Sequence, residues 1–317
     1  LVASVLRNQN AISGVLVLEK NMTYGKCSKG KRFLYKCVPD DKRIPIFLVA
    51  YTLDNSGFSK HYINKYVVFK YKEWNETHPI GELTLVIGDV NKLENFYEYQ
   101  LYCKSLNATI QDFTNDAKTR MREMTESVYI EAIQANYNVE NRRNWSGIYS
   151  IDPCGSRDFD DAFGLREVGD GVHVTLSIYI SNVSLWMDAL RLWTSFSNRI
   201  STIYLPDRKR PMLPTVLSDI LCSLLENQVR FAFVMDVNVN EMTGEISQIS
   251  FKNASIVVER NCRYDEPELE NNTIYNRVLT LTKKMSPESK IVDSHDMIAY
   301  LMILMNYQCA RKFMEYK

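Results

Sequence analysis

Residues 151–163 read IDPCGSRDFDDAF, and four aspartates fall within ten positions of this stretch: Asp152, Asp158, Asp160 and Asp161. Apolar residues flank the stretch, and like charges held this close repel one another, more strongly beside an apolar wall. Either the aspartates lie on a solvated acidic turn, or they bind a cation. Acid count alone favours the solvated turn. The spacing D-x-[DN]-x-[DN]-G-x₅-E, which a calcium loop requires, is absent.

A single cation site requires the chain to turn within this stretch. A plain strand would point Asp160 and Asp161 to opposite faces. Pro153 and Gly155 provide turn residues directly after Asp152. Ligation by carboxylate oxygens alone suits Mg²⁺ or Mn²⁺ and not zinc. Two such ions about 4 Å apart would be arranged for in-line attack of water on a phosphodiester.

The composition of the whole chain limits the classes of protein to which it can belong. The chain has 317 residues, which predicts about two domains, and 45% hydrophobic with 24% charged residues excludes wholesale disorder. Lys plus Arg and Asp plus Glu are both 38, so the net charge is zero. Coating of nucleic acid by bulk positive charge is therefore excluded, whereas a local basic groove is not.

Cysteine spacing and hydropathy indicate in which cellular compartment the protein is expected. The seven cysteines are widely spaced without a C-x-x-C pair, which argues against a zinc ribbon or a disulfide framework. Reduced thiols in a cytoplasmic or nuclear protein fit this usage better. The longest apolar stretch, residues 297–305, is too short for a membrane span, so we expect no membrane association. Because the first residue is Leu1, we expect a fragment or a processed chain.

Hydrophobic patterning divides the chain into three parts. Between residues 14 and 105, five short strand-like runs alternate with turn residues, which predicts a small barrel or sandwich. Residues 108–142 lack Gly and Pro and predict one or two helices. From residue 145 the pattern mixes elements: a strand at 172–180, a hairpin at 235–251 and an apolar helix at 297–313.

The spacing D-x₅-D-x-D-D, with Ile before and Pro after the first Asp, resembles the catalytic signature of the ribonuclease II (RNB) family. Further segments resemble family motifs in the same order: 203–208 (IYLPDR), 211–214 (PMLP), 217–224 (LSDILCSL), 227–230 (NQVR) and 256–264. The resemblance runs from about residue 145 to 306. This ordered set favours the catalytic interpretation over the solvated turn.

Earlier residues resemble the second cold-shock domain of the eukaryotic family members, which include the catalytic subunit of the RNA exosome. The matching segments are 39–45 (PDDKRIP) and 74–81. The resemblance implies a mixed fold, in which an OB-type β-barrel precedes an α+β, partial RNB catalytic domain. We therefore expect residues 1–13 to be the tail of a preceding segment, 14–107 the OB fold, 108–144 a helical linker and 145–317 the RNB domain.

The resemblance also implies residue roles. The four aspartates would bind Mg²⁺ or Mn²⁺ at the scissile phosphate, and loss of Asp160 should leave RNA bound but uncut. Tyr264 would lie against the reacting phosphate or the last nucleotide, and Tyr204 would stack on a base near the 3′ end. The alternative for each tyrosine is an amphipathic core residue, and for Tyr264 taken alone the two interpretations are equally good. A basic run would contact phosphate or form a solvated surface: Arg208, Lys209 and Arg210.

Two departures from the family pattern stand out. The family has I-E-E-x-M where residues 298–302 read IAYLM, so Ala299 and Tyr300 replace the acids. Asn182 stands where an Asp is usual.

The rest of the RNB domain and a C-terminal OB domain would follow Lys317. A helix with apolar residues on all sides is normally buried. We therefore predict that these segments or a partner chain cover residues 297–313.

Two functions follow. The first is a Mg-dependent exoribonuclease that degrades single-stranded RNA from 3′ to 5′ by a two-metal mechanism and releases nucleoside 5′-monophosphates, alone or in an exosome-like complex. The alternative is a catalytically reduced homologue that binds RNA or scaffolds a complex. The intact set of aspartates favours the enzyme, and the missing Glu pair favours the alternative.

Overall fold

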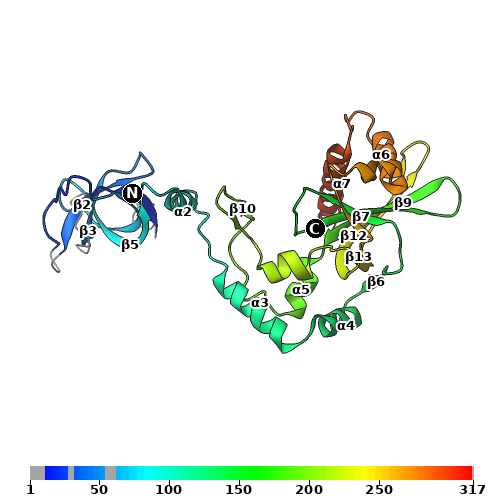
Figure 1. Cartoon of the computed structure of the whole chain (residues 1–317), viewed down its shortest axis with the longest axis horizontal. Helices are drawn as coiled ribbons and strands as arrows, with labels where there is room; N and C mark the ends of the chain where they lie inside the picture. Colours follow the sequence, from blue (N-terminus) through cyan, green and yellow to red (C-terminus); the bar gives the residue numbers. More distant parts are fainter. Residues whose placement is uncertain (1–10, 28–31, 54–61, 316–317) are drawn as a thin grey trace. The chain divides into compact units, whose positions relative to one another are not determined.

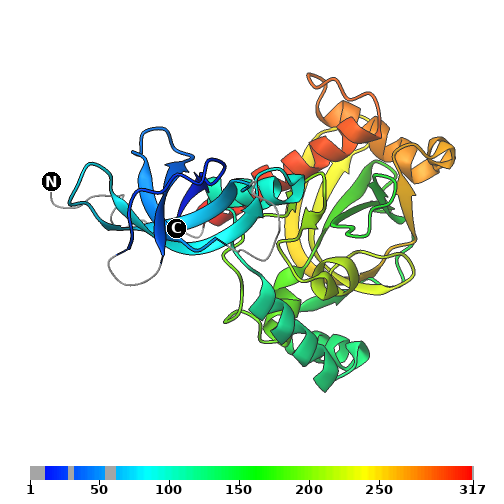
Figure 2. The ribbon, with the colours of Figure 1, turned by 60° about the vertical axis from the view of Figure 1, so that its left-hand side comes forward.

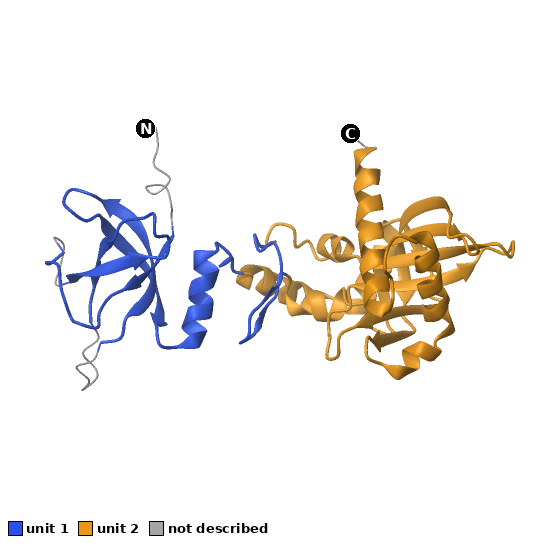
Figure 3. Cartoon of the chain, turned by 90° about the horizontal axis from the view of Figure 1, so that it is seen from above, with its two compact units in different colours: residues 1–109, 197–212 blue, residues 110–196, 213–317 orange. Residues whose placement is uncertain are grey.

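The computed structural model describes residues 11–27, 32–53 and 62–315. These residues form two compact units (Figure 3): residues up to 109 with 197–212, and residues 110–196 with 213–317. Residues 1–10 of the predicted N-terminal tail lie outside the described residues. The predicted domain boundaries remain a prediction, and each unit is described by itself.

The first unit contains a closed five-stranded barrel with the strand order β1-β2-β3-β5-β4 (Figures 1 and 2). Its strands are β1 (Ile12–Leu16), β2 (Phe33–Pro39), β3 (Phe47–Tyr51), β4 (Lys65–Glu73) and β5 (Ile80–Asp89). Each overlaps one of the five predicted runs. Closure, in which β1 pairs with β4, excludes the sandwich and confirms the OB-type barrel.

Helix α2 (Leu93–Cys103) follows the barrel and was not predicted. Its sequence, LENFYEYQLYC, is rich in the aromatic residues that usually favour strands. The ring of Tyr99 stacks on Tyr66 of β4 with the centroids 4.3 Å apart. Tertiary packing of one helix face against the barrel therefore outweighs local propensity.

The second unit is built on a seven-stranded sheet with the order β14-β7-β8-β9-β12-β13-β6. The strands are β6 (Val139–Asn141), β7 (Ile148–Asp152), β8 (Asp161–Glu167), β9 (His173–Ser181), β12 (Val229–Asn240), β13 (Ile246–Val257) and β14 (Arg260–Arg263). The predicted strand at 172–180 and the predicted hairpin at 235–251 are confirmed. The two outer pairs, β14 with β7 and β13 with β6, are parallel.

Helices pack on this sheet in two groups. Helices α6 (Thr273–Met285) and α7 (Ser294–Met314) lie together on one face (Figures 1 and 2). A second cluster surrounds the buried Trp186 and contains α3 (Gln111–Glu123), α4 (Glu126–Asn136), α5 (Val183–Ala189) and the π-helical turn η1 (Val216–Leu221). The predicted helices in 108–142 and at 297–313 are confirmed.

Helix α7 buries only part of its apolar surface. Met297 and Leu301 are fully buried in the core, whereas the side chains of Ile303, Tyr307 and Phe313 are more than half exposed. Such a run of exposed apolar groups is typical of a surface that is covered in a larger assembly. Among the described residues, no helix has the length and apolarity that crossing a bilayer requires.

A buried ion pair joins the segment before β7 to the centre of the sheet. The Arg142 side chain is fully buried, and its two terminal nitrogens donate to the Asp236 carboxylate at 2.8 and 2.5 Å. The Ser177 hydroxyl of β9 donates to the same carboxylate, and the guanidinium lies over the Trp145 ring. The pair therefore connects strands β9 and β12 to the chain that leads into β7.

Replacing Asp236 by Asn should destabilise this unit by about 3–5 kcal/mol, because the buried guanidinium loses its counter-charge. Urea denaturation followed by tryptophan fluorescence measures this, since Trp145, Trp186 and Trp193 lie in this unit. The matched control is Glu140→Gln, which removes the more exposed partner of Arg142 and should cost less than about 1 kcal/mol. Equal losses in both variants would contradict the prediction.

Candidate active site

The aspartates of residues 151–163 lie where two neighbouring strands meet a turn. Asp152 is the last residue of β7 and Asp161 is the first residue of β8. The two strands pair antiparallel, so their connected ends lie side by side. Gly155 adopts a φ of +83°, and the Ser156 amide donates to the Pro153 carbonyl. The turn that a single site requires is therefore present.

Asp152 and Asp161 are carboxylates in an unfavourable environment. Burial raises the pKa of Asp161 to about 7, and repulsion from Asp152 and Asp160 adds to the effect. Burial likewise raises the pKa of Asp152 to about 6, although a hydrogen bond from Ser150 opposes the shift. The Oδ2 atom of Asp152 is buried without a hydrogen-bond partner. A bound cation would satisfy this oxygen and remove the repulsion.

The other two aspartates lie on the connecting loop. Asp158 is half-buried and Asp160 is exposed. Both act on the pKa of Asp152, so the four side chains share one neighbourhood. Within the described residues, no three His, Cys, Asp or Glu side chains converge closely enough to hold one ion. The four-aspartate metal set therefore remains a prediction.

A serine distant in sequence holds the aspartate loop. The fully buried Ser223 hydroxyl accepts from the Phe159 amide and donates to the Arg157 carbonyl, both at 3.0 Å. These two backbone groups flank Asp158. The Ser223 carbonyl in turn accepts from the buried Arg230 side chain at 2.9 Å. This clamp fixes the backbone of the loop that carries two of the four carboxylates.

Tyr264 lies beside the pair formed by Asp152 and Asp161. It follows β14, and its amide donates to the Asp152 carbonyl at 3.3 Å. Burial raises the pKa of Tyr264 to about 12, with the charges of Asp161 and Asp152 adding to the effect, so the phenol stays neutral near pH 7. Its ring stacks on the imidazole of His295, a residue that the sequence reasoning missed. No sequence signal links the two, because only folding of α7 brings them together.

The acids at the start of α7 are engaged in capping. The Asp293 carboxylate accepts from the Asp296 amide, and the Asp296 carboxylate accepts from the Val292 amide. Ala299 is exposed and Tyr300 packs against the apolar core under α7. No carboxylate therefore occupies the positions where the family pattern has a Glu pair.

Asn182 also has a structural role. It caps helix α5 by accepting from the Leu185 amide at 3.3 Å, and it donates to the Asn253 side chain at 2.9 Å. An amide can make both contacts because it carries a donor and an acceptor, whereas an ionised carboxylate has only acceptors.

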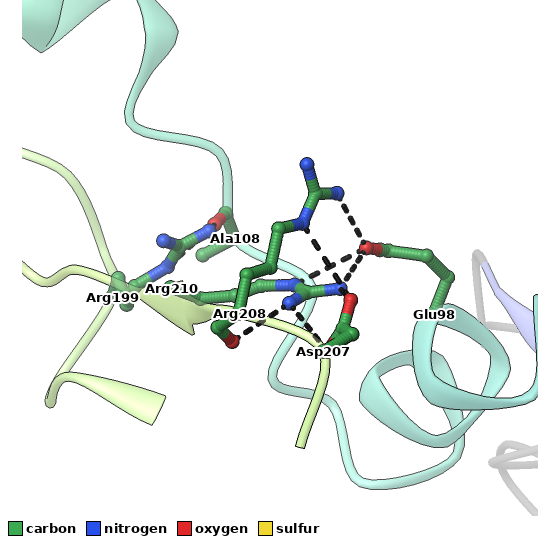
Figure 4. A network of polar contacts seen from close by, with 6 residues as sticks. All are labelled: Glu98, Ala108, Arg199, Asp207, Arg208 and Arg210. Atoms are coloured by element: carbon green, nitrogen blue, oxygen red, sulfur yellow. Dashed lines mark hydrogen bonds and ion pairs between the residues drawn. The ribbon is translucent and has the colours of Figure 1, made fainter. Parts of the chain in front are cut away.

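The basic run lies on a hairpin that belongs to the barrel unit, formed by β10 (Ile203–Tyr204) and β11 (Lys209–Arg210). Figure 4 shows the buried Arg210 side chain donating to Glu98 of α2 and to Asp207, at 2.5 and 3.0 Å. Arg208 also donates to Glu98, at 3.1 Å. Arg210 is therefore used to attach the hairpin to α2.

The predicted RNA contacts differ in accessibility. Tyr204 is 72% exposed and the Arg208 side chain is 69% exposed, so both can reach a ligand. Lys209 is half-buried and takes part in interactions within the protein. Arg210 is the least accessible of the four. Their role in RNA binding remains a prediction.

Two models of known protein domains match this chain. The RNB domain matches residues 141–283, and the Dis3-like cold-shock domain 2 (CSD2) matches residues 34–99. The chain is therefore homologous to proteins that carry these two domains. It is 26% identical over 275 residues to the exosome complex exonuclease RRP44 of Mus musculus, which covers 84% of this chain and 27% of that protein. The chain thus spans about a quarter of the length of this curated relative.

Solved structures confirm the fold. The chain resembles Mycoplasma genitalium RNase R in complex with ribose-methylated single-stranded RNA, with a TM-score of 0.73, 18% identity and coverage of 99% of this chain and 53% of that one. It also resembles yeast Ssd1, a pseudonuclease, with a TM-score of 0.60, 16% identity and coverage of 87% and 33%. Nucleases and a pseudonuclease therefore share this architecture, and the fold alone does not decide activity.

Replacing Ser223 by Ala should loosen the aspartate loop, because the Phe159 amide loses its acceptor. We expect amide exchange in residues 153–160 to accelerate about tenfold, in line with about 1–3 kcal/mol for an unsatisfied group. Hydrogen–deuterium exchange by mass spectrometry measures this. Ser247→Ala removes one hydrogen bond at the exposed end of β13 and is the control. Unchanged exchange in Ser223→Ala would exclude the clamp.

Proposed function

We propose that this protein is a metal-dependent ribonuclease that degrades single-stranded RNA from 3′ to 5′ and releases nucleoside 5′-monophosphates. One observation carries the proposal: Asp152 and Asp161 are half-buried close together with raised pKa values, and the buried Oδ2 atom of Asp152 has no hydrogen-bond partner. Buried acids coupled in this way are typical of sites that bind a cation or transfer protons. The curated relative RRP44 is itself named an exonuclease.

The same residues suit Mg²⁺ or Mn²⁺, because these ions prefer carboxylate oxygens. Asp152 and Asp161 would provide the half-buried ligands, and Asp158 and Asp160 would contribute from the clamped loop. A divalent cation held there supplies positive charge to the reacting phosphate. The protein's own contribution is to hold four acidic groups in one neighbourhood despite their repulsion.

Other side chains act directly on the RNA. The neutral Tyr264 phenol donates a hydrogen bond to an oxygen of the terminal nucleotide, since its raised pKa keeps the proton in place. The exposed Asp160 carboxylate accepts a hydrogen bond from the attacking water. Tyr204, exposed on its hairpin, stacks on a base without regard to sequence, because every base offers a π face.

A catalytically reduced homologue is the second candidate. The absence of acids at Ala299 and Tyr300 favours it, and so does the shared fold of the pseudonuclease Ssd1. Such a protein would bind RNA or scaffold a complex without cutting. Membership of an exosome-like complex and a cytoplasmic or nuclear location are proposals common to both candidates.

Asp152 and Asp161 should make stability depend on pH. Because their pKa values are raised in the folded state, the folded chain holds more protons than the unfolded chain between about pH 4 and pH 7, so stability falls as the pH rises through this window. A cation must displace these protons, so Mg²⁺ should stabilise more at about pH 8 than at about pH 5. At about 100 times its Kd, the gain is about 2.7 kcal/mol.

Thermal unfolding across this pH range, with and without Mg²⁺ or Mn²⁺, measures both effects. The variant with Asp152→Asn and Asp161→Asn should lose the pH dependence of this window and the gain from metal. A gain from Mg²⁺ that persists in this double variant would place the cation elsewhere.

Asp160→Asn should reduce cleavage by about 100-fold while RNA binding persists, because the substitution removes a charge at the reacting phosphate and leaves the rest of the surface intact. The assay follows shortening of 5′-labelled single-stranded RNA with Mg²⁺, and filter binding reports affinity. Asp170→Asn, in an exposed acid that accepts hydrogen bonds from the Val172 and His173 amides, is the matched control. Intact RNA in the wild-type sample, with binding retained, would favour the catalytically reduced homologue.

A further inference from the structure

A stacked pair of rings stands beside the carboxylates. The imidazole of His295 and the phenol of Tyr264 lie face to face, with centroids 3.8 Å apart and planes 16° from parallel. We propose that His295 is a positioning residue that fixes the Tyr264 ring against the aspartate pair by this stack. The proposal rests on the proposed function, in which Tyr264 contacts the terminal nucleotide.

The Tyr264 side chain packs partly against the hydrophobic core under α7, but that packing is incomplete. The residue lies in a turn just beyond the end of β14, and its ring is only half-buried. In the part of the chain that the structure describes, no residue hydrogen-bonds to its hydroxyl. A half-buried ring without a polar anchor can adopt several rotamers. The ring plane is therefore set by what packs on its faces.

His295 is a rigid platform because it belongs to a fixed helix start. The preceding Ser294 is buried, and Met297 is fully buried in the core under α7. The carboxylate of Asp293 caps the helix by accepting from the Asp296 amide at 3.1 Å. The imidazole therefore keeps its position without being part of the core.

The stack also restricts how a nucleotide can approach. The face of Tyr264 covered by the imidazole cannot take a nucleobase, so the ligand must use the other face or the hydroxyl edge. The charges of Asp161 and Asp152 act on the phenol, so this edge lies in their field. His295 thereby orients the hydroxyl for a phosphate or ribose oxygen next to the acids.

Because His295 is exposed, its positioning role can be tested with little disturbance of the fold. An exposed imidazole buries little surface, so its loss should change folding little but should free the tyrosine ring. Two variants test this in the full chain. His295→Ala removes the stack, and His295→Phe keeps a planar ring without the imidazole nitrogens. His173→Ala, at an exposed histidine beside Asp170, is the control.

Nitration of Tyr264 by tetranitromethane, quantified by peptide mass spectrometry, reports the stack without any turnover. The His295→Ala variant should be nitrated about 3- to 10-fold faster than wild type, as expected for loss of an aromatic contact. The His295→Phe and His173→Ala variants should match wild type. Equal nitration in wild type and His295→Ala would overturn the proposal.

Turnover tests the positioning role. We expect His295→Ala to lower kcat on single-stranded RNA by about 3- to 10-fold with KM within about twofold, and His295→Phe to restore it. An unchanged kcat in His295→Ala, or a His295→Phe variant as slow as His295→Ala, would overturn the role. A wild-type protein that does not cut RNA would overturn the proposed function instead, and nitration would still decide whether the stack exists.

Discussion

The structure of this site depends on one unfavourable arrangement: two half-buried carboxylates lie close together at the connected ends of β7 and β8. Pairing of Asp152 with β14 and of Asp161 with β9 fixes the positions of both residues, and partial burial weakens their hydration. Neither strand can shift without breaking the register of the central sheet. The sheet therefore holds two carboxylates in a repulsive arrangement that a bound cation would relieve. The Ser223 clamp, the turn at Gly155 and the stack of Tyr264 on His295 surround this position.

Support for the site comes from segments far along the chain. The Ser223 hydroxyl bridges two backbone groups of the aspartate loop, and Arg230 holds the carbonyl of Ser223. Arg230 also donates to Glu126 of α4, so the helical cluster is tied to the loop. Residues that never contact a ligand thus fix the geometry of those that would, as preorganised electrostatic sites require.

Relatives with the same architecture include named exonucleases and a pseudonuclease, so the chemistry resides in individual side chains. In this chain the aspartates are intact, while Ala299 and Tyr300 replace the acids of α7. The capping acids Asp293 and Asp296 are engaged with helix amides and do not replace them. The balance between nuclease and reduced homologue therefore depends on whether four acids suffice at this site.

The sequence alone indicated the homology to RNB proteins, the central hairpin and the turn after Asp152, because motif spacing and hydrophobic periodicity are local properties that a single chain displays directly. Its strand pattern fitted either a barrel or a sandwich, and the resemblance to a cold-shock domain favoured the barrel. Helix α2, the burial of Arg210 against Glu98 and the stack of His295 on Tyr264 were decided only by tertiary structure. Each depends on contacts between segments distant in sequence. Packing energy from such contacts outweighs local propensity, and no spacing rule encodes which distant side chains will meet.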